Sequence, residues 1–309
     1  MSQGRRDFVR TGLLAASATA VGVATKVGVA ATDSPGTDDV PATLALTPDG
    51  HLVAVHQVGP ASAPPPAVDA RRGIEGRKWV MVFDLAACDG CGDCTEECGK
   101  LHFIPPDREW IRVYKMQDSP ETTPYWFPKP CFHCDNPPCT KVCPVGATFK
   151  REDGLVLIDN DRCIGCRFCM AACPYSTRVF NWGRPTDPAE ARAQPYSPET
   201  GFPRRVGTVE KCDFCPDMAR EGKLPHCACR CTMGAIYFGD ENEDAVTNGK
   251  GATVRLSALL RDRAAYRYFE ELGTHPRVYY LPPTNRRYEA PVPGGGHRAG
   301  AHAKPDARP

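Results

Sequence analysis

The sequence has no strong excess of positive or negative charge and no long hydrophobic run beyond its first residues. Much of its length also contains no cysteine. A net charge of +1 at pH 7 gives none of the basic field that nucleic-acid-binding domains carry. No stretch after the N-terminal region reaches the length of a transmembrane helix, so membrane attachment is expected through a partner. No C-x-x-C-H pattern occurs, so nothing indicates covalently bound haem.

Cysteine is confined to the middle of the chain, since none of the 17 cysteines lies before Cys88 or after Cys231. Disulfides alone cannot use an odd number of thiols. A length of 309 residues with 24% charged residues suggests an ordinary globular protein of about two domains. The cysteines therefore indicate a chemical role for the middle stretch.

Sixteen of the cysteines form four groups of four. The first and third groups have the spacing C-x2-C-x2-C-x3-C, whereas the second and fourth have insertions before their third member. The groups are Cys88, Cys91, Cys94 and Cys98; Cys131, Cys134, Cys139 and Cys143; Cys163, Cys166, Cys169 and Cys173; and Cys212, Cys215, Cys227 and Cys231. In such spacing three thiolates hold one [4Fe–4S] cluster and the fourth ligates its neighbour. Group four alone could pass for a zinc site, but groups one and three place three thiolates in one short loop, which disfavours zinc. Four [4Fe–4S] clusters are predicted.

Groups two and three are compact and are separated by two strand-like runs that join at Asp153-Gly154, a hairpin signal. Groups one and four flank this unit, and Ala235-Ile-Tyr-Phe238 after group four mirrors Ala147-Thr-Phe149 after group two. The predicted fold is α+β, with two nested bacterial-ferredoxin-like units, each holding two clusters, and loop-rich insertions.

Nesting predicts which cysteines share a cluster. The four expected sets, named here A to D, are Cys88, Cys91, Cys94 and Cys231 for set A; Cys98, Cys212, Cys215 and Cys227 for set B; Cys131, Cys134, Cys139 and Cys173 for set C; and Cys143, Cys163, Cys166 and Cys169 for set D. Cys229 is left over as a free or buried thiol, because the x3 gap fits Cys227 and Cys231. The alternative that Cys229 replaces Cys227 as a ligand stays open.

The segments Pro130-Cys-Phe-His-Cys-Asp-Asn-Pro-Pro-Cys139 and Asp161-Arg-Cys-Ile-Gly-Cys-Arg-Phe-Cys-Met-Ala-Ala-Cys-Pro-Tyr175 resemble the iron–sulfur subunits of complex iron–sulfur molybdoenzymes. The resemblance is to the tetrathionate, polysulfide and dimethyl sulfoxide reductase type. It implies a relay, used in anaerobic respiration, between a quinone-reactive integral membrane subunit and a molybdopterin oxidoreductase catalytic subunit. The alternative is the iron–sulfur subunit of an exported hydrogenase or of a quinone-linked nitrite or sulfite complex.

The sequence favours a non-catalytic electron-transfer subunit over a free-standing oxidoreductase, because all sixteen proposed ligands are used and no acid–base pocket is indicated. His102, His133 and His226 lie near ligands. A proton-relay role is less expected for them than packing. Arg167 and Arg230 adjoin ligands and either raise cluster potentials or face solvent, with no preference between the two.

The remaining segments are assigned by composition. Arg5-Arg6, Phe8 and a weakly hydrophobic run predict a twin-arginine signal over residues 1–31, and hence a location in the periplasm or on the outer face of the cytoplasmic membrane. A Pro/Ala-rich linker over 32–75, with one short strand at His51–Val58, leads to a four-cluster domain over 79–240 whose inner unit spans 125–182. A helix and an extended docking segment are expected over 252–289, before a disordered tail over 290–309.

Overall fold

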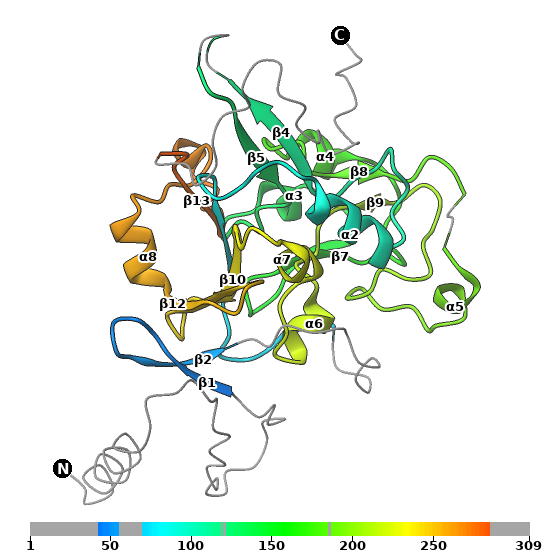
Figure 1. Cartoon of the computed structure of the whole chain (residues 1–309). Helices are drawn as coiled ribbons and strands as arrows, with labels where there is room; N and C mark the ends of the chain where they lie inside the picture. Colours follow the sequence, from blue (N-terminus) through cyan, green and yellow to red (C-terminus); the bar gives the residue numbers. More distant parts are fainter. Residues whose placement is uncertain (1–42, 56–69, 118, 120–121, 185–186, 285–309) are drawn as a thin grey trace, which may run out of the picture. The chain divides into compact units, whose positions relative to one another are not determined.

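The computed structural model describes residues 43–55, 70–117, 119, 122–184 and 187–284 (Figure 1). The predicted signal over residues 1–31, much of the linker and the tail over 290–309 lie outside this range. All of the cysteines lie inside it. No helix in these ranges combines the length and the apolar character that crossing a bilayer requires.

The largest sheet has five strands in the order β12-β11-β10-β3-β13. Only β13 runs parallel to its neighbour β3; the other pairs are antiparallel. The strands are β3 (Trp79–Asp84), β10 (Ile236–Asp240), β11 (Ala245–Asn248), β12 (Thr253–Arg255) and β13 (Val278–Leu281). Every residue of β3 is buried, because both faces of the sheet are covered, and its sequence is accordingly apolar at five consecutive positions.

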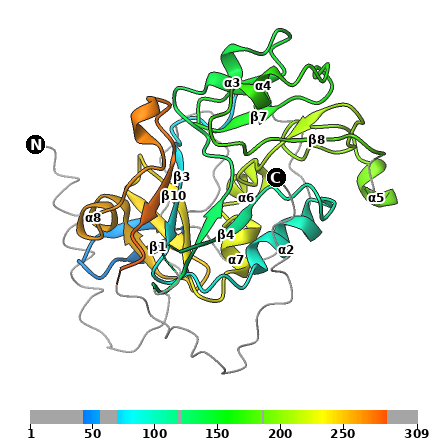
Figure 2. The same ribbon diagram turned by 90° about the horizontal axis from the view of Figure 1, so that it is seen from above.

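The two faces of the sheet pack against different partners. Trp79, Met81 and Phe83 belong to the cluster that includes many of the cysteines, and the Trp79 ring stacks on Phe238 with centroids 5.4 Å apart. Val80 and Val82 face the other way, in a second cluster that contains residues of α8 (Leu256–Asp262). Both views place α8 beside this sheet (Figures 1 and 2). The sheet thus forms one wall of the cysteine-bearing region.

The inner unit contains the hairpin that the sequence predicts. Strands β6 (Thr148–Lys150) and β7 (Val156–Ile158) pair antiparallel, and the chain turns at Asp153-Gly154. Gly154 has φ +85, and a Cβ there would meet Nε of Arg277 at 2.9 Å. The turn therefore needs glycine both for its backbone conformation and for the space.

The outer unit repeats the pattern of the inner one. The Asp84 N–H, at the end of β3, donates to the Ala235 carbonyl at 2.8 Å, and the Asp159 N–H donates to the Ala147 carbonyl at the same distance. Asp84 and Asp159 then accept from the N–H of Cys88 and Cys163, each at 3.1 Å. The strand before one cysteine group thus pairs with the strand after another in both units, as nesting requires. The α+β class and the ferredoxin-like architecture are confirmed.

Short helices carry many of the cysteines. Both views place α2 beside α7 and α3 beside α4 (Figures 1 and 2). Their bounds are α2 (Asp93–Leu101), α3 (Pro138–Lys141), α4 (Phe168–Ala171), α6 (Pro216–Arg220) and α7 (His226–Arg230). The remaining elements are β1 (Thr43–Leu46), β2 (Leu52–Val55), β4 (Arg112–Met116), β5 (Tyr125–Lys129), β8 (Val179–Phe180), α5 (Ala189–Arg192), β9 (Val209–Glu210) and the 3-10 helix η1 (Glu270–Leu272).

The predicted linker differs from its sequence-based prediction, because β1 and β2 form an antiparallel hairpin where a single strand was expected. Over residues 252–284 the structure has a helix, Leu256–Asp262, followed by the extended strand β13, as the sequence predicts. Tyr266 exchanges two backbone hydrogen bonds of 2.9 Å with Tyr280. This bridge and the positive φ of Ala264 draw the chain out of the helix.

Candidate metal centres

The cysteines are gathered in the interior without being cross-linked. All 17 lie among the described residues, none of them is in a disulfide, and each is buried or half-buried. Cys98, Cys131, Cys212 and Cys215 are buried, whereas Cys88, Cys91, Cys163 and Cys166 are half-buried. Unpaired thiols gathered in this way are suited to binding soft metal ions.

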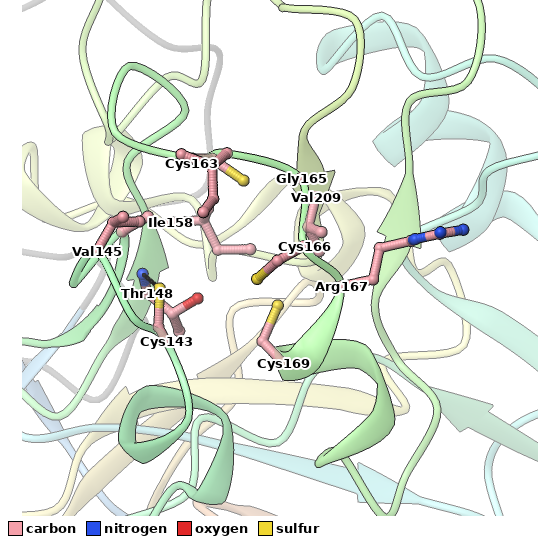
Figure 3. Close-up of a pocket in the computed structure, with 12 residues that line it drawn as sticks. Cys143, Val145, Thr148, Ile158, Cys163, Gly165, Cys166, Arg167, Cys169 and Val209 are labelled. Atoms are coloured by element: carbon pink, nitrogen blue, oxygen red, sulfur yellow. Dashed lines mark hydrogen bonds between the residues drawn. The ribbon is translucent and has the colours of Figure 1, made fainter.

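Set D lines one cavity (Figure 3). Cys163, Cys166 and Cys169 reach it from one loop and the start of α4, and Cys143 reaches it from the end of group two. The loop lies tightly against its neighbour, because a Cβ on Gly165 would come within 2.2 Å of the Gly207 carbonyl oxygen. Ile164 and Phe168 are 64% and 60% exposed, so this loop runs along the protein surface.

Sets C and B line two further cavities. Cys131, Cys134, Cys139 and Cys173 surround one, together with Tyr175 and Arg178. The other is lined by Cys98, Cys212, Cys215 and Cys227, together with Trp110 and His102. In sets B, C and D the structure therefore brings together the same four thiols that ligand exchange predicts.

The thiols of set A lie close enough together to shift one another's pKa. Burial, followed by the charges of Cys231 and Cys91, raises the pKa of Cys94 to about 12. Burial also raises the pKa of Cys88, and Cys94 and Cys231 add to the shift. Cys231 is thus close to Cys88 and Cys94 of group one, although it belongs to group four.

Burial dominates the electrostatics of these sites. It is the largest cause that raises the pKa of Cys134 and of Cys212, each to about 12. In set D, burial raises the pKa of Cys143, but the N–H groups of Thr148, Val145, Ala147 and Gly146 outweigh it and lower that pKa. Deprotonated buried sulfurs require a cationic partner, which bound iron supplies. Four converging thiols per site fit a [4Fe–4S] cluster.

The three histidines near the ligands have different surroundings. The Val156 N–H donates to Nδ1 of His133 at 3.0 Å, so Nε2 carries the proton and donates to the Cys212 carbonyl at 3.0 Å. Both ring nitrogens are therefore used, Nδ1 within the inner unit and Nε2 in a contact with the outer unit, which agrees with a packing role. The half-buried His226 meets the edge of the His102 ring, with centroids 5.9 Å apart.

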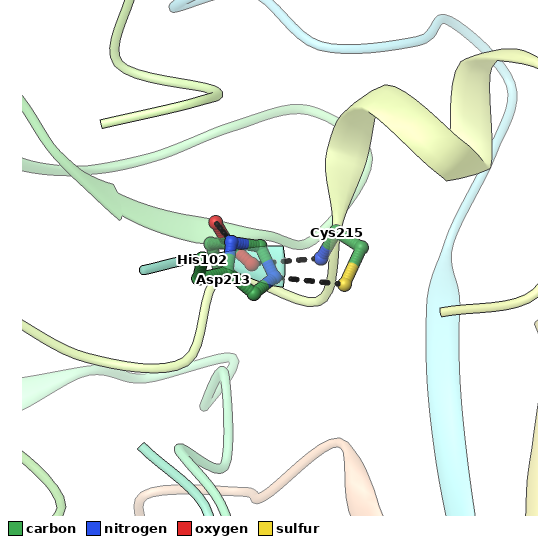
Figure 4. Close-up of side chains that lie close together, drawn as sticks. All are labelled: His102, Asp213 and Cys215. Atoms are coloured by element: carbon green, nitrogen blue, oxygen red, sulfur yellow. Dashed lines mark hydrogen bonds and ion pairs between the residues drawn. The ribbon is translucent and has the colours of Figure 1, made fainter. Parts of the chain in front are cut away.

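His102 approaches a sulfur directly (Figure 4). Its Nε2 lies 3.4 Å from Sγ of Cys215, and its Nδ1 lies 4.0 Å from Oδ2 of Asp213. The three ligand atoms lie within 4.8 Å of one another, but Cys215 already belongs to set B. His102 is therefore placed to donate an N–H to a ligand sulfur, and this group is part of set B rather than a separate metal site.

Cys229 does not line any of the three cavities that sets B, C and D line. Its thiol donates to the Leu224 carbonyl at 3.3 Å, while the neighbouring Cys227 lines the cavity of set B. This arrangement favours Cys227 as the ligand and leaves Cys229 as a half-buried thiol.

Two alternatives were left open for Arg167 and Arg230, and their positions agree with the one in which they face solvent. The Arg167 side chain points away from the sulfurs of set D (Figure 3) and lies over the rings of Phe180 and Trp182, at 5.3 and 4.8 Å from their centroids. Arg230 is exposed. Sequence reasoning missed Arg178, which lines the cavity of set C. The signal in the sequence that could have pointed to Arg178 is its place directly before the two apolar residues of β8, Val179 and Phe180.

Comparison with known proteins matches this geometry. Two family models described as a 4Fe–4S dicluster domain match residues 122–187 and 87–147. A selenate reductase subunit from Mesobacillus selenatarsenatis is 38% identical over 230 residues, which cover 69% of this chain and 76% of the relative. The menaquinone reductase iron–sulfur cluster-binding subunit of Nitratidesulfovibrio vulgaris is 39% identical, covering 66% and 88%. A tetrathionate reductase subunit from Salmonella typhimurium is 35% identical, covering 69% and 76%. The chain therefore belongs to the iron–sulfur electron-transfer subunits of the complex iron–sulfur molybdoenzyme family, of the tetrathionate, polysulfide and dimethyl sulfoxide reductase type, and binds [4Fe–4S] clusters.

Proposed function

We propose that the chain holds four [4Fe–4S] clusters in a single row and passes electrons along it between two partner subunits. The observation that carries this proposal is the convergence of sixteen cysteines in four sets of four, with the fourth member of each sequence group exchanged. Each bound cluster supplies one-electron chemistry. The protein's own residues hold the clusters, exclude water from the middle of the row and fix the contacts between sites.

The order of the row is supported by the sulfurs that influence one another across sets. Cys227 of set B is close enough to Cys94 and Cys231 of set A for their charges to raise its pKa, after burial. Cys131 of set C likewise adds to the raised pKa of Cys212 in set B. Cys139 of set C and Cys169 of set D both adjoin Arg178. These contacts support the order A, B, C, D.

The burial of the thiols changes along the row in a way that suits electron transfer. The thiols of set B are all buried, and three of the four in set C are buried. At the two ends, three thiols of set A and three of set D are half-buried. Electrons can thus enter and leave at the ends, while the middle sites are shielded from solvent.

Relatives support the identity of the partners. One is named as a subunit of selenate reductase and another as the cluster-binding subunit of a menaquinone reductase. We assign the partners of this chain to a molybdopterin-type catalytic subunit and a quinone-reactive integral membrane subunit. The chain itself is the non-catalytic link between them.

Metal analysis tests the cluster count. Protein purified without oxygen is expected to contain about sixteen irons and as many acid-labile sulfides per chain, because each of four cubanes holds four of each. Iron and sulfide assays on the same sample give both numbers. About eight irons would reduce the row to two clusters, and zinc without sulfide would overturn the proposal.

Export is the second part of the proposal. Arg5-Arg6 lies before a weakly hydrophobic run, in residues outside the described range. Thiols exported unfolded would meet an oxidising compartment and form disulfides, so clusters should be inserted in the cytoplasm first. Changing both arginines to lysine should leave an iron-loaded precursor in the cytoplasm. Fractionation with an antibody and iron analysis measures this. Normal export of the double variant would contradict a twin-arginine route, and an iron-free cytoplasmic precursor would contradict the order of events.

A further inference from the structure

Arg178 differs from every other buried arginine in the described part of the chain. Four arginines are buried there, and three of them, Arg151, Arg204 and Arg277, each contact two carboxylates. Arg178 is 5% exposed, and no carboxylate of the described residues pairs with it. A buried cation without a counter-charge is strongly disfavoured, so this one requires an anion of another kind.

The hydrogen bonds of Arg178 leave much of its donor capacity unused. Nη1 donates to Oγ1 of Thr148 at 3.3 Å, and Nη2 is buried without a partner. Thr148 begins β6, and it lines the cavity of set D, while Arg178 lines the cavity of set C. The guanidinium group therefore lies at the boundary between the two inner sites.

Sulfurs of both inner sites surround this guanidinium group. Burial lowers the pKa of Arg178, but the charges of Cys139, Cys169, Cys131 and Cys173 outweigh it. Of these, Cys169 belongs to set D and the others to set C. Burial raises the pKa of Cys139 and of Cys169, and in each case the charge of Arg178 is the first effect that opposes it. The anions that Arg178 faces are thus the thiolates of two different clusters.

We propose that Arg178 is a counter-charge shared by the clusters of sets C and D, and that it raises the reduction potential of both. A cubane with four thiolates carries about two negative charges when oxidised and gains a third on accepting one electron. A nearby cation stabilises the more negative state, and strongly so away from water. The proposal rests on the proposed four-cluster row and adds to it a residue that sets two of its potentials.

Other buried charges bear on neighbouring sites. Lys211 is also buried; its Nζ donates to the Cys212 carbonyl of set B at 2.8 Å, and its charge also acts on Cys139 of set C. Set B adjoins the carboxyl groups of Asp213 and Asp217. Arg178 is therefore expected to act on sets C and D and to leave the potentials of sets A and B unchanged.

The test is a redox titration of the purified full chain, followed by EPR, on Arg178→Gln, Arg178→Lys and the control Arg167→Gln. Arg178→Gln should weaken the electron affinity of two clusters at least about tenfold, which is about 59 mV for a one-electron couple. Arg178→Lys keeps the charge and should restore most of this loss. Arg167→Gln removes a charge beside Cys166 in the sequence, but from a side chain that points away from the sulfurs, and should move no potential.

Each outcome decides between the shared role and its alternatives. Four unchanged potentials in iron-replete Arg178→Gln would overturn the proposal, and a shift of one cluster alone would overturn the sharing. If Arg178→Gln loses iron, the lysine variant decides the question. Recovery of both the iron content and the reduction potentials in Arg178→Lys supports the proposal. Failure of Arg178→Lys to restore the iron content or the potentials overturns the charge mechanism. Fewer than four clusters in the unmodified protein would instead contradict the proposed function.

Discussion

Replacement of Cys166 by alanine is expected to remove about one iron per chain and to convert one cubane into a three-iron cluster. Cys166 lines the cavity of set D together with Cys143, Cys163 and Cys169. Its side chain is half-buried, so the truncation leaves little empty space in the core. Three thiolates remain to hold three irons, and the fourth iron, without its protein ligand, is lost.

The resemblance to molybdoenzyme subunits leads to the same expectation. In the nitrate reductase branch, a tryptophan in place of one cysteine of group three accompanies a three-iron cluster. EPR of the oxidised variant should therefore show a new three-iron signal, while iron analysis falls from about sixteen to about fifteen. An unchanged spectrum and iron content would remove Cys166 from the ligands.

Cys229→Ala is the matched control, because it truncates the one cysteine that no set requires. Its thiol contacts the Leu224 carbonyl, and Cys227, on the same short helix, lines the cavity of set B. Iron content and the EPR spectra of this variant should equal those of the unmodified protein. Loss of a cluster would instead show that Cys229 is the ligand and Cys227 is not.

Local sequence patterns predicted the features that depend on a few neighbouring residues. The spacing of groups one and three indicates cluster loops because three thiolates in so short a segment have few other uses. Asp153-Gly154 predicts a hairpin because glycine permits the positive φ of the turn, and β6 pairs with β7 there. The likeness of Ala235–Phe238 to Ala147–Phe149 predicts the repeat, which the equivalent hydrogen bonds of Asp84 and Asp159 confirm.

Features that depend on distant partners could not be predicted in the same way. Nothing near Arg178 in the sequence shows that its side chain reaches sulfurs from two groups without meeting a carboxylate. The register of Tyr266 with Tyr280, which ends the helix, is likewise set by the tertiary fold. His133 lies between two cysteines in sequence, but the Cys212 carbonyl that it contacts belongs to the far side of the nested arrangement.

Arg151→Met is expected to destabilise the protein by about 3–5 kcal/mol, because it breaks a buried ionic network by removing its central cation. Arg151 follows β6 in the inner unit and has a fully inaccessible side chain that contacts Asp153 and Glu199. Glu199 also accepts from Arg220 of α6 at 2.6 Å, so the network joins the inner hairpin to a helix of the outer unit. Methionine fills similar space but leaves the Asp153 carboxylate buried without its cation.

The measurement is the rate at which cluster absorbance is lost in denaturant, since a protein with bound clusters does not unfold as a simple two-state system. Native contacts that must break before the transition state of unfolding is reached slow unfolding, so the variant should lose its clusters at least about tenfold faster. Arg72→Met is the matched control. Arg72 pairs with Glu75 and Glu152, but side chains 59%, 78% and 61% exposed place those pairs in water, where they contribute about 0–1 kcal/mol. Equal rates for the two variants would contradict a stabilising role for the buried network. A faster loss in Arg151→Met alone would show that this buried charge network helps to hold the two nested units together.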